Sequence, residues 1–392
     1  IRDSCQEVHL NLAYRWFCRL DLADPAPDHS TFSKNRHGRF RESNVFRHLF
    51  EAVLARCIAE GLVGGEAFGA DASLIKADAS RYTKVDFTEW SAADAANRVT
   101  QEYLGTLDDA AFGAATPVKP KAISSADPAA RLTGANGDRP FFAYSTNYLV
   151  DLDHAIIVDV EGSEGMKSIR GIDFPTDAPI RRAEVGAVRN MLLRARSRFK
   201  LHPELLAADT AYGAADMLGW LVEEQDIEPH IPVFDKSERK DGAFSVTDFV
   251  YDPETDAYQC PGGKVLKPYW GNISNGRPQY GKDGCKKYFA RKRDCVACPL
   301  KPQCTPNQAT RKISRSRHEN ARQKARDIAG TDAYVASSYA RKKVEMLFAH
   351  LKRIIGLDRL GLCGPNGAKD EFLLAATVQN LRKLAKLRSL PA

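Results

Sequence analysis

The spacing of apolar residues predicts a helical beginning for this chain. Apolar residues recur at mixed helical spacing from Val8 to Leu20, and the segment Asp24-Pro25-Ala26-Pro27 interrupts them. Proline removes the amide hydrogen that a helix interior needs, so the first helix ends before this segment. Ser30 is predicted to cap a short helix through Arg36, and a third helix is predicted from Ser43 to Glu60, before Gly61.

A helix, a tight break and a short basic helix follow one another in the order of a helix-turn-helix. Such a motif would bring basic residues in and just after the second helix near DNA; they are Lys34, Arg36, Arg39 and Arg41. A plain helical bundle explains the same pattern equally well.

From residue 65 onward, short apolar runs alternate with segments of helical spacing. Strands are predicted at Ala67–Asp71, Phe141–Asp151, His154–Val160, Leu205–Asp209 and Glu228–Val233. Helices are predicted around Glu184–Ala195 and at Tyr212–Gln225, Asp332–Ile355 and Asp370–Leu387. Residues 86–138 are rich in Ala, Asp, Pro and Gly, which predicts a helix followed by a loose linker at about 105–138. The order of elements is that of a mixed α/β protein.

Length and composition define the class of protein. The chain has 392 residues, which predicts two or three structural units, and 43% of them are hydrophobic, enough for a sizeable core. No apolar run approaches the ~18 residues of a membrane span. The N-terminus has neither Met nor an apolar signal core. It has the character of an internal segment, so we expect an N-terminal piece to be missing.

The positive charge is modest in total but uneven along the chain. The net charge is +7, from 57 Lys and Arg against 50 Asp and Glu. Basic residues cluster at 311–326, where Glu319 is the single acid, and again at 382–388. Clusters of this kind favour a polyanionic partner, although charge alone is equally typical of solvated helix faces.

Three isolated acids are candidates for chemistry. Asp71 and Asp209 each end a short apolar run, and Glu345 lies within a strongly basic helix. Carboxylates of this kind can hold two Mg²⁺ ions about 3.5–4 Å apart, the arrangement that phosphoryl transfer uses. Taken singly, an Asp at the end of a strand is more often a turn or a helix cap.

The basic helix presents its acid in a particular setting. Arg341, Glu345, Phe348 and Lys352 are spaced by 4, 3 and 4 residues, which places them on one helix face. A Glu between two cations would ionise readily and approach a phosphate beside them. A surface ladder of salt bridges has the same spacing.

The sequence around these acids resembles bacterial insertion-sequence DDE transposases over nearly the whole chain. The matching blocks are Asn11–Phe17, Pro27–Phe32, Phe68–Ser80, Ala207–Gly213 and the Arg341, Glu345, Lys352 spacing. Two departures stand out. Thr210 and Ala211 occupy positions where the family usually has Lys and Gly, and Ser338 occupies a position that is often Tyr, with Tyr339 next to it.

The resemblance implies an α/β fold with a ribonuclease-H-like mixed sheet and flanking helices, an N-terminal all-α domain and a cysteine-rich insertion. The implied domains are an N-terminal DNA-binding region at 1–64, the first part of the catalytic core at 65–240, the insertion at 241–330 and the C-terminal catalytic helices at 331–392.

The implied activity is metal-dependent cleavage at transposon ends and strand transfer into target DNA. Asp71, Asp209 and Glu345 would bind Mg²⁺ or Mn²⁺, and Arg341 and Lys352 would contact phosphate. The implied partners are the terminal inverted repeats and the target DNA, bound by a homodimer in the bacterial cytoplasm and associated with the nucleoid when on DNA. No membrane partner is expected.

Cysteines concentrate in the insertion. Five of the nine lie at residues 260, 285, 295, 298 and 304, and without a secretory signal such a cluster favours metal ligation over disulfides. Cys295 and Cys298 form a C-x₂-C pair suited to Zn²⁺. Cys260 and Cys304 are the best remaining pair, a choice that the resemblance favours, with Cys285 as the spare, although Cys285 could replace Cys260. Reduced free thiols are the alternative.

The same segment combines bases with aromatic residues in a way that would suit the DNA backbone and bases. They are Lys282, Lys286, Lys287, Arg291, Lys292, Arg293, Tyr280, Tyr288 and Phe289. Three other functions fit parts of these observations: a catalytically inactive DNA-binding remnant of a transposase, a metal-dependent nuclease without strand transfer, and a zinc-organised interaction module.

Overall fold

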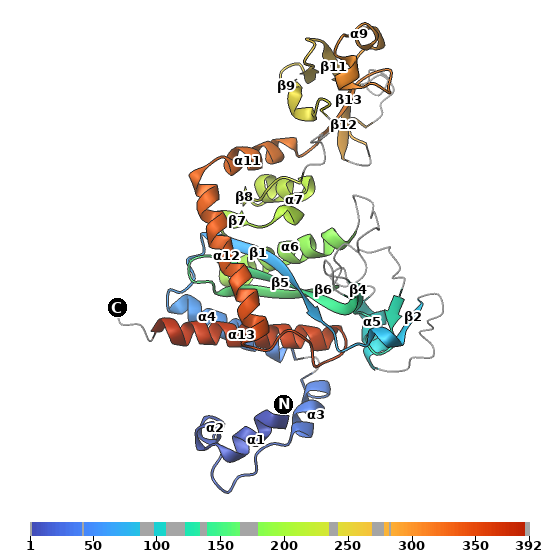
Figure 1. Cartoon of the computed structure of the whole chain (residues 1–392). Coiled ribbons are helices and arrows are strands. Elements are labelled where there is room, and N and C mark those ends of the chain that lie inside the picture. Colours follow the sequence, from blue (N-terminus) through green and yellow to red (C-terminus); the bar gives the residue numbers. More distant parts are fainter. Residues whose placement is uncertain are drawn as a thin grey trace.

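The computed structural model describes residues 2–40, 43–86, 98–106, 122–133, 139–164, 179–234, 242–268, 278–281 and 284–388. Figure 1 shows a central sheet with helices around it, a small β-rich unit beyond one end, and three short N-terminal helices beyond the other. Among the described residues, no helix is long and apolar enough to cross a bilayer.

The central sheet is mixed, as the order of elements predicted. Its strands lie in the order β4-β5-β1-β7-β8. Strand β6 pairs with β5 along the edge opposite β1, the edge that β4 also pairs with. Strand β1 is antiparallel to β5 and parallel to β7, which in turn is parallel to β8. The strands are β1 (Ala67–Lys76), β4 (Arg131–Thr133), β5 (Phe141–Asp151), β6 (Ile157–Glu164), β7 (Leu205–Ala207) and β8 (Glu228–His230). The α/β class with a ribonuclease-H-like mixed sheet is thereby confirmed.

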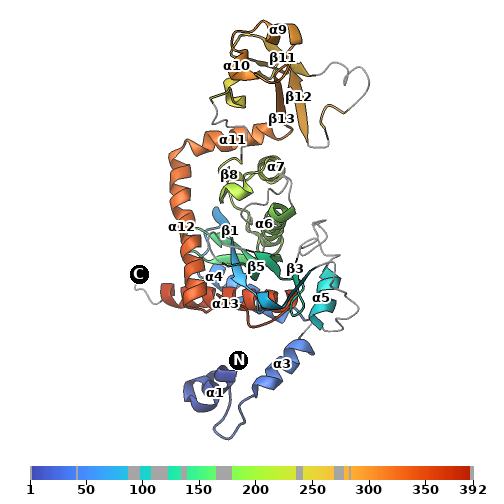
Figure 2. The same cartoon turned by 45° about the vertical axis from the view of Figure 1, so that its right-hand side comes forward.

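Helices cover both faces of this sheet. Helix α6 (Pro179–Phe199) packs on β5 and β6 from one side, while α12 (Asp332–Arg353) crosses β1, β7 and β8 from the other (Figure 2). Helix α13 (Pro365–Arg388) packs on β6 and on α4 (Val45–Ala59). Because strand β5 is covered on both faces, its residues are buried almost continuously, whereas half of the residues of β1 are buried.

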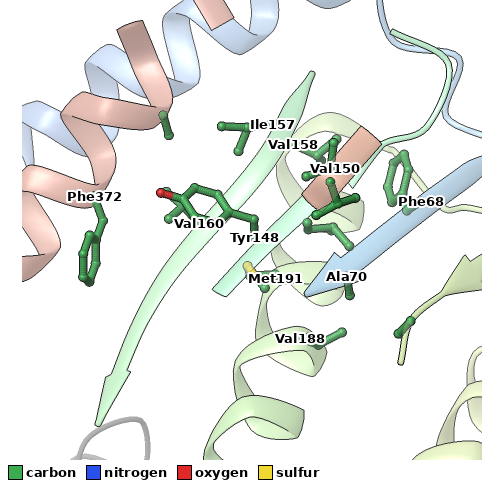
Figure 3. Packing of buried hydrophobic residues seen from close by; sticks show 14 of the residues in the cluster. Phe68, Ala70, Tyr148, Val150, Ile157, Val158, Val160, Val188, Met191 and Phe372 are labelled. Atoms are coloured by element: carbon green, nitrogen blue, oxygen red, sulfur yellow. The ribbon is translucent and has the colours of Figure 1, made fainter. Parts of the chain in front are cut away.

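The core fills the space between these layers. Figure 3 shows Ala70 of β1 near Val188 and Met191 of α6, on one face of the sheet. Tyr148 of β5 faces the other side, where its ring centroid lies 5.5 Å from that of Phe348 on α12. Burial of such side chains stabilises the fold by about 1.5–3 kcal/mol each.

The N-terminal region contains three short helices, α1 (Arg2–Leu10), α2 (Leu12–Phe17) and α3 (His29–His37). The predicted cap at Ser30 is wrong, because Asp28 caps α3 by accepting a hydrogen bond from the Ser30 amide at 2.8 Å. The third predicted helix is confirmed as α4, which is slightly shorter than predicted.

The insertion has a sheet and a small core of its own. Its strands are β9 (Val250–Asp252), β10 (Ala257–Gln259), β11 (Val265–Pro268), β12 (Cys285–Phe289) and β13 (Lys312–Ser316), with helices α9 (Lys292–Val296) and α10 (Lys301–Cys304). Phe249, Tyr258, Leu266 and Tyr288 are buried within it. The following helix, α11 (Glu319–Ala329), instead packs on α7 (Ala215–Gly219) and β8, and its Ala321 and Ala325 belong to the central core.

Three local predictions differ from the structure. The range predicted as a loose linker begins within α5 (Arg98–Thr106) and contains β3 (Ala122–Ser124) and β4, and β3 pairs with β2 (Lys84–Asp86). Buried Asp127 orders this part by accepting hydrogen bonds from the Tyr144 hydroxyl and the Gly364 amide. The helix predicted at Tyr212–Gln225 is broken into a 3-10 turn, α7 and a π-helical turn at Trp220–Glu224. The last helix begins at Pro365 rather than Asp370.

Candidate active site

Asp71 lies in the middle of β1, not at its end as the apolar run predicted. The strand continues to Lys76 because residues 72–76 also pair with β5, where Asp71 is opposite Tyr148. The side chain of Asp71 is 19% exposed, on the face of the sheet that α12 crosses. Its carboxylate is therefore held rigidly by paired backbone on a central strand.

The parallel pairing of β1 with β7 brings Asp209 beside Asp71. Gly69 is opposite Ala207, and each acid follows its paired residue by two positions. Asp209 lies just beyond the end of β7, close enough for its charge to raise the pKa of Asp71. Asp209 also caps the 3-10 turn at Thr210–Tyr212, its Oδ1 accepting from the Ala211 amide at 2.9 Å. Asp209 thus caps the 3-10 turn and also lies beside Asp71.

Gly69 allows α12 to approach the sheet at this point. A Cβ atom on Gly69 would lie 2.9 Å from Cγ2 of Val344 and 2.8 Å from Cδ2 of Leu152. Val344 is fully buried and precedes Glu345 in the helix. The close contact therefore places the Arg341 and Glu345 turns of α12 over the acids of the sheet.

Arg341 joins the acid of the strand to the acid of the helix. Its Nη1 lies 3.6 Å from Oδ2 of Asp71, and its Nη2 lies 3.0 Å from Oε1 of Glu345. Burial raises the pKa of Asp71 to about 6; the Ala72 amide opposes the rise, Asp209 adds to it, Arg341 lowers it again and Glu345 raises it. Asp71 thus feels both other acids, so three carboxylates from distant parts of the sequence share one electrostatic environment.

The donor set fits a hard divalent cation by its chemistry. Carboxylate oxygens are the ligands that Mg²⁺ and Mn²⁺ accept, and three carboxylates with one guanidinium leave net negative charge. Among the described residues, however, no group of three or more His, Cys, Asp or Glu side chains stands ready to hold a metal ion. The Arg341 guanidinium bridges two of the three acids, and Glu345 is 54% exposed. Metal binding would require these two flexible side chains to move.

The other residues predicted to contact DNA differ in exposure. Lys352 lies on α12 and is half-buried, and Arg39 is exposed after α3. Arg36 is only 8% exposed, and its Nη1 bonds Oδ2 of Asp370 on α13 at 3.1 Å. Arg36 is therefore largely buried, and its guanidinium attaches the N-terminal helices to α13. Its contact with DNA stays a prediction. Arg41 lies outside the described residues.

Two residues that sequence reasoning left without a role complete the second acid block. Tyr212 is 1% exposed, and among the described residues its hydroxyl has no hydrogen-bond partner. Burial raises the pKa of Tyr212 well above its usual range, and the carboxylates of Glu184, Asp71 and Asp209 raise it further. Gly213 follows, where a Cβ would lie 2.0 Å from the Pro232 carbonyl oxygen. In the sequence, both residues are visible as the Tyr-Gly pair that ends the block around Asp209.

The cysteines of the insertion separate into a group of four and a single one. Cys260, Cys295, Cys298 and Cys304 line one cavity of about 30 Å³, whereas Cys285 lies on β12 outside it. Burial raises the pKa of the Cys304 thiol, and the three other cysteines of the cavity raise it further. Thiol donors suit Zn²⁺. As for the acids, these thiols do not form a ready-made ligand set among the described residues.

The basic and aromatic residues of the insertion only partly form an exposed surface. Tyr288 is 1% exposed, and its hydroxyl donates to Asp256, so it is not available to stack on a base. Lys286 is paired with the same Asp256. Arg291, Lys292 and Arg293 are exposed, and Tyr280 is 39% exposed. Lys282 lies outside the described residues.

Comparison with protein families defines the class. Residues 259–385 match the family described as Transposase DDE domain, and residues 1–38 match the Transposase domain (DUF772). The first match contains Glu345 and the cysteine cluster, and the second covers the N-terminal helices. Together the two matches support an insertion-sequence DDE transposase, as the resemblance implied. A comparison with curated proteins gave no significant match.

Proposed function

We propose that this transposase cleaves DNA at transposon ends and joins the freed 3′ end to target DNA, with Asp71, Asp209 and Glu345 as its catalytic acids. The observation that carries the proposal is the bridge from Arg341 to both Asp71 and Glu345, beside Asp209. Asp71 and Arg341 are far apart in the sequence, so the tertiary fold and not local helix geometry brings these charges together.

Each acid contributes a different property to the site. Asp71 and Asp209 are held by the sheet and provide fixed oxygen ligands, whereas Glu345 reaches from a helix and can adjust its position. Two Mg²⁺ or Mn²⁺ ions held there would supply a deprotonated oxygen nucleophile and neutralise charge on the leaving oxygen. With metal ions bound to the acids, the Arg341 guanidinium would no longer be needed to balance their charge and could bind phosphate. Lys352 lies on the same helix face and would also bind phosphate.

The test is strand transfer with pre-cleaved transposon-end DNA and a supercoiled target, in Mg²⁺ and in Mn²⁺. We expect Asp71→Asn, Asp209→Asn and Glu345→Gln each to lose at least a hundredfold in the joining rate while still binding the end. Asp216→Asn is the matched control, because the side chain of Asp216 is 87% exposed and lies away from the acids. Equal joining by Glu345→Gln and the unmodified protein would exclude the proposed site.

Two other functions are distinguished by the same experiment. Nicking of the end without joining would identify a metal-dependent nuclease. Binding without either reaction would identify an inactive DNA-binding remnant. Pairing of two ends also calls for a homodimer, so the DNA complex is expected to contain two copies of the chain, assembled on bacterial DNA.

We further propose that one Zn²⁺ ion joins the four cysteines of the insertion. Among the described residues, the core of this sheet is a cluster of six buried apolar side chains, too few to stabilise a separate unit firmly. A tetrahedral thiolate site would link the β10–β11 turn, through Cys260, to α9 through Cys295, to the loop after α9 through Cys298 and to α10 through Cys304. Its role would be structural, away from the acids.

A further inference from the structure

Helices α12 and α13 form a groove beside the candidate active site. It has a volume of about 1070 Å³, and its lining includes Tyr339, Lys342, Met346, Arg353, Arg382 and Lys386. We call it the α12–α13 groove. It differs from the site of the three acids, none of which lines it.

The groove begins one step around α12 from the acids. Lys342, Met346 and Arg353 are spaced by 4 and 7 residues and share one helix face. Each follows Arg341, Glu345 or Lys352 by one position, which is a rotation of about 100° around the helix. A strand bound at the Arg341–Glu345 face therefore reaches the groove by passing over one edge of the same helix.

The groove is strongly cationic. Its lining has six Lys or Arg side chains and, among the described residues, one acid, Asp153. The bases crowd one another: burial lowers the pKa of Lys383, and the neighbouring charges of Lys386 and Lys343 lower it further. Like charges held together in this way are relieved by an anionic ligand.

Apolar side chains are exposed between these bases. Met346 is 70% exposed and Tyr339 is 64% exposed, although both lie on an ordered helix. The Nζ atom of Lys342 lies 4.5 Å from the centre of the Tyr339 ring. Phosphates alone would not need an apolar surface, whereas unpaired bases stack on aromatic rings and pack on thioethers.

We propose that the α12–α13 groove binds single-stranded DNA next to the scissile phosphate, with phosphates on its lysines and arginines and bases on Tyr339 and Met346. The proposal rests on the function proposed above, because it requires a scissile phosphate at Glu345. Lys342 and Arg353 are 11 residues apart, or about 16 Å along the helix, a length over which a B-form strand places about five phosphates. An acidic helix of another protein would match the charge, but nothing would require it to lie beside the acids.

The experiment measures what a single-stranded tail adds to the binding of a duplex. Glu345→Gln is the background, so that the DNA stays intact. Fluorescence anisotropy gives the affinity for hairpin duplexes of one transposon end that carry tails of zero, three or six nucleotides. We expect the six-nucleotide tail to tighten binding at least tenfold and to steepen the salt dependence by about 3.5 in log–log slope, since about five phosphates would each contribute about 0.7.

Variants of the groove separate its two contributions. Tyr339→Ala should remove most of the tenfold gain without changing the salt slope, and Lys342→Ala with Lys386→Ala should reduce both. Lys312→Ala, an exposed base on β13, is the matched control and should leave the gain from the tail intact. Unchanged thermal unfolding would show that each variant is folded.

The possible outcomes distinguish the two proposals. A gain from the tail that survives all groove variants would overturn the groove while leaving the transposase function in place. Absence of any DNA binding by the unmodified chain would overturn both. A change in self-association by the lysine variants, with no effect on the tail, would instead identify a protein-binding surface.

Discussion

Replacing Asp71 by Asn should stabilise the folded protein at neutral pH in the presence of a chelator. Burial raises the pKa of Asp71 to about 6, against 3.8 for an unperturbed side chain. The fold thus disfavours the ionised carboxylate, and this unfavourable free energy is present above both values. The shift corresponds to about 3 kcal/mol, an upper estimate for a side chain that is 19% exposed.

The effect has a defined pH dependence. As the pH falls through 6 toward 3.8, the carboxyl group protonates in the fold and the penalty is lost. The same relation leaves ~0.6 kcal/mol at pH 4. In the Asp71→Asn variant, the side-chain amide oxygen can still accept the hydrogen bond that the Ala72 amide donates to Oδ1 at 2.8 Å. The substitution therefore removes the charge with little other change.

The assay is urea unfolding of both proteins with EDTA, at pH 7.5 and pH 4, followed by the same measurement in excess Mg²⁺. We expect a gain of about 1–3 kcal/mol at pH 7.5 and a much smaller one at pH 4. Mg²⁺ should narrow the difference, because only the unmodified site would bind it tightly. Glu345→Gln is the control within the site and should change stability by less than about 1 kcal/mol, since its side chain is 54% exposed. A lower stability of Asp71→Asn at pH 7.5, or a gain independent of pH, would refute this reasoning.

Three further substitutions test the structure elsewhere. Gly69→Ala should destabilise the fold by about 1–3 kcal/mol and slow strand transfer at least tenfold, because its Cβ would displace Val344 and α12. The control is Gly186→Ala, which has open space at its Cβ and should be neutral or stabilising in the same urea titration. Arg36→Ala should lower stability by about 1–3 kcal/mol by leaving Asp370 unpaired, without changing the salt slope of DNA binding. Arg39→Ala should reduce the salt slope of DNA binding without changing stability. Identical behaviour of the two variants would contradict a structural role for Arg36 and a DNA-binding role for Arg39. Metal analysis should find one Zn²⁺ per chain, lost in Cys298→Ser and retained in Cys285→Ser, and equal zinc content in both variants would exclude the four-cysteine site.

Much of the fold was readable from local patterns. The long hairpin β5–β6, helix α6 and helices α12 and α13 all follow from apolar periodicity, because each element buries one or both faces in the core. The insertion's sheet was not predicted, since its strands are short and its buried residues are few. The two strands within the predicted linker were also missed. Asp127 of that segment accepts a hydrogen bond from the Gly364 amide, more than two hundred positions away, and no local pattern indicates this contact.

The sequence by itself determined which residues are candidates for chemistry. The block order and the Arg341, Glu345, Lys352 spacing pointed to the acids, the cysteine spacing pointed to the Cys295–Cys298 pair, and the resemblance favoured Cys260 and Cys304 as its partners. These are local properties, set by residue type and helical period, so they are visible without a fold.

Only the tertiary structure decided what those residues can do. The parallel register of β1 and β7 and the space above Gly69 bring three distant acids together. The same packing places Arg36 against Asp370 rather than on an exposed surface, and it opens the cationic groove between α12 and α13. Long-range pairing and burial depend on how separate segments meet, and no local pattern contains that information.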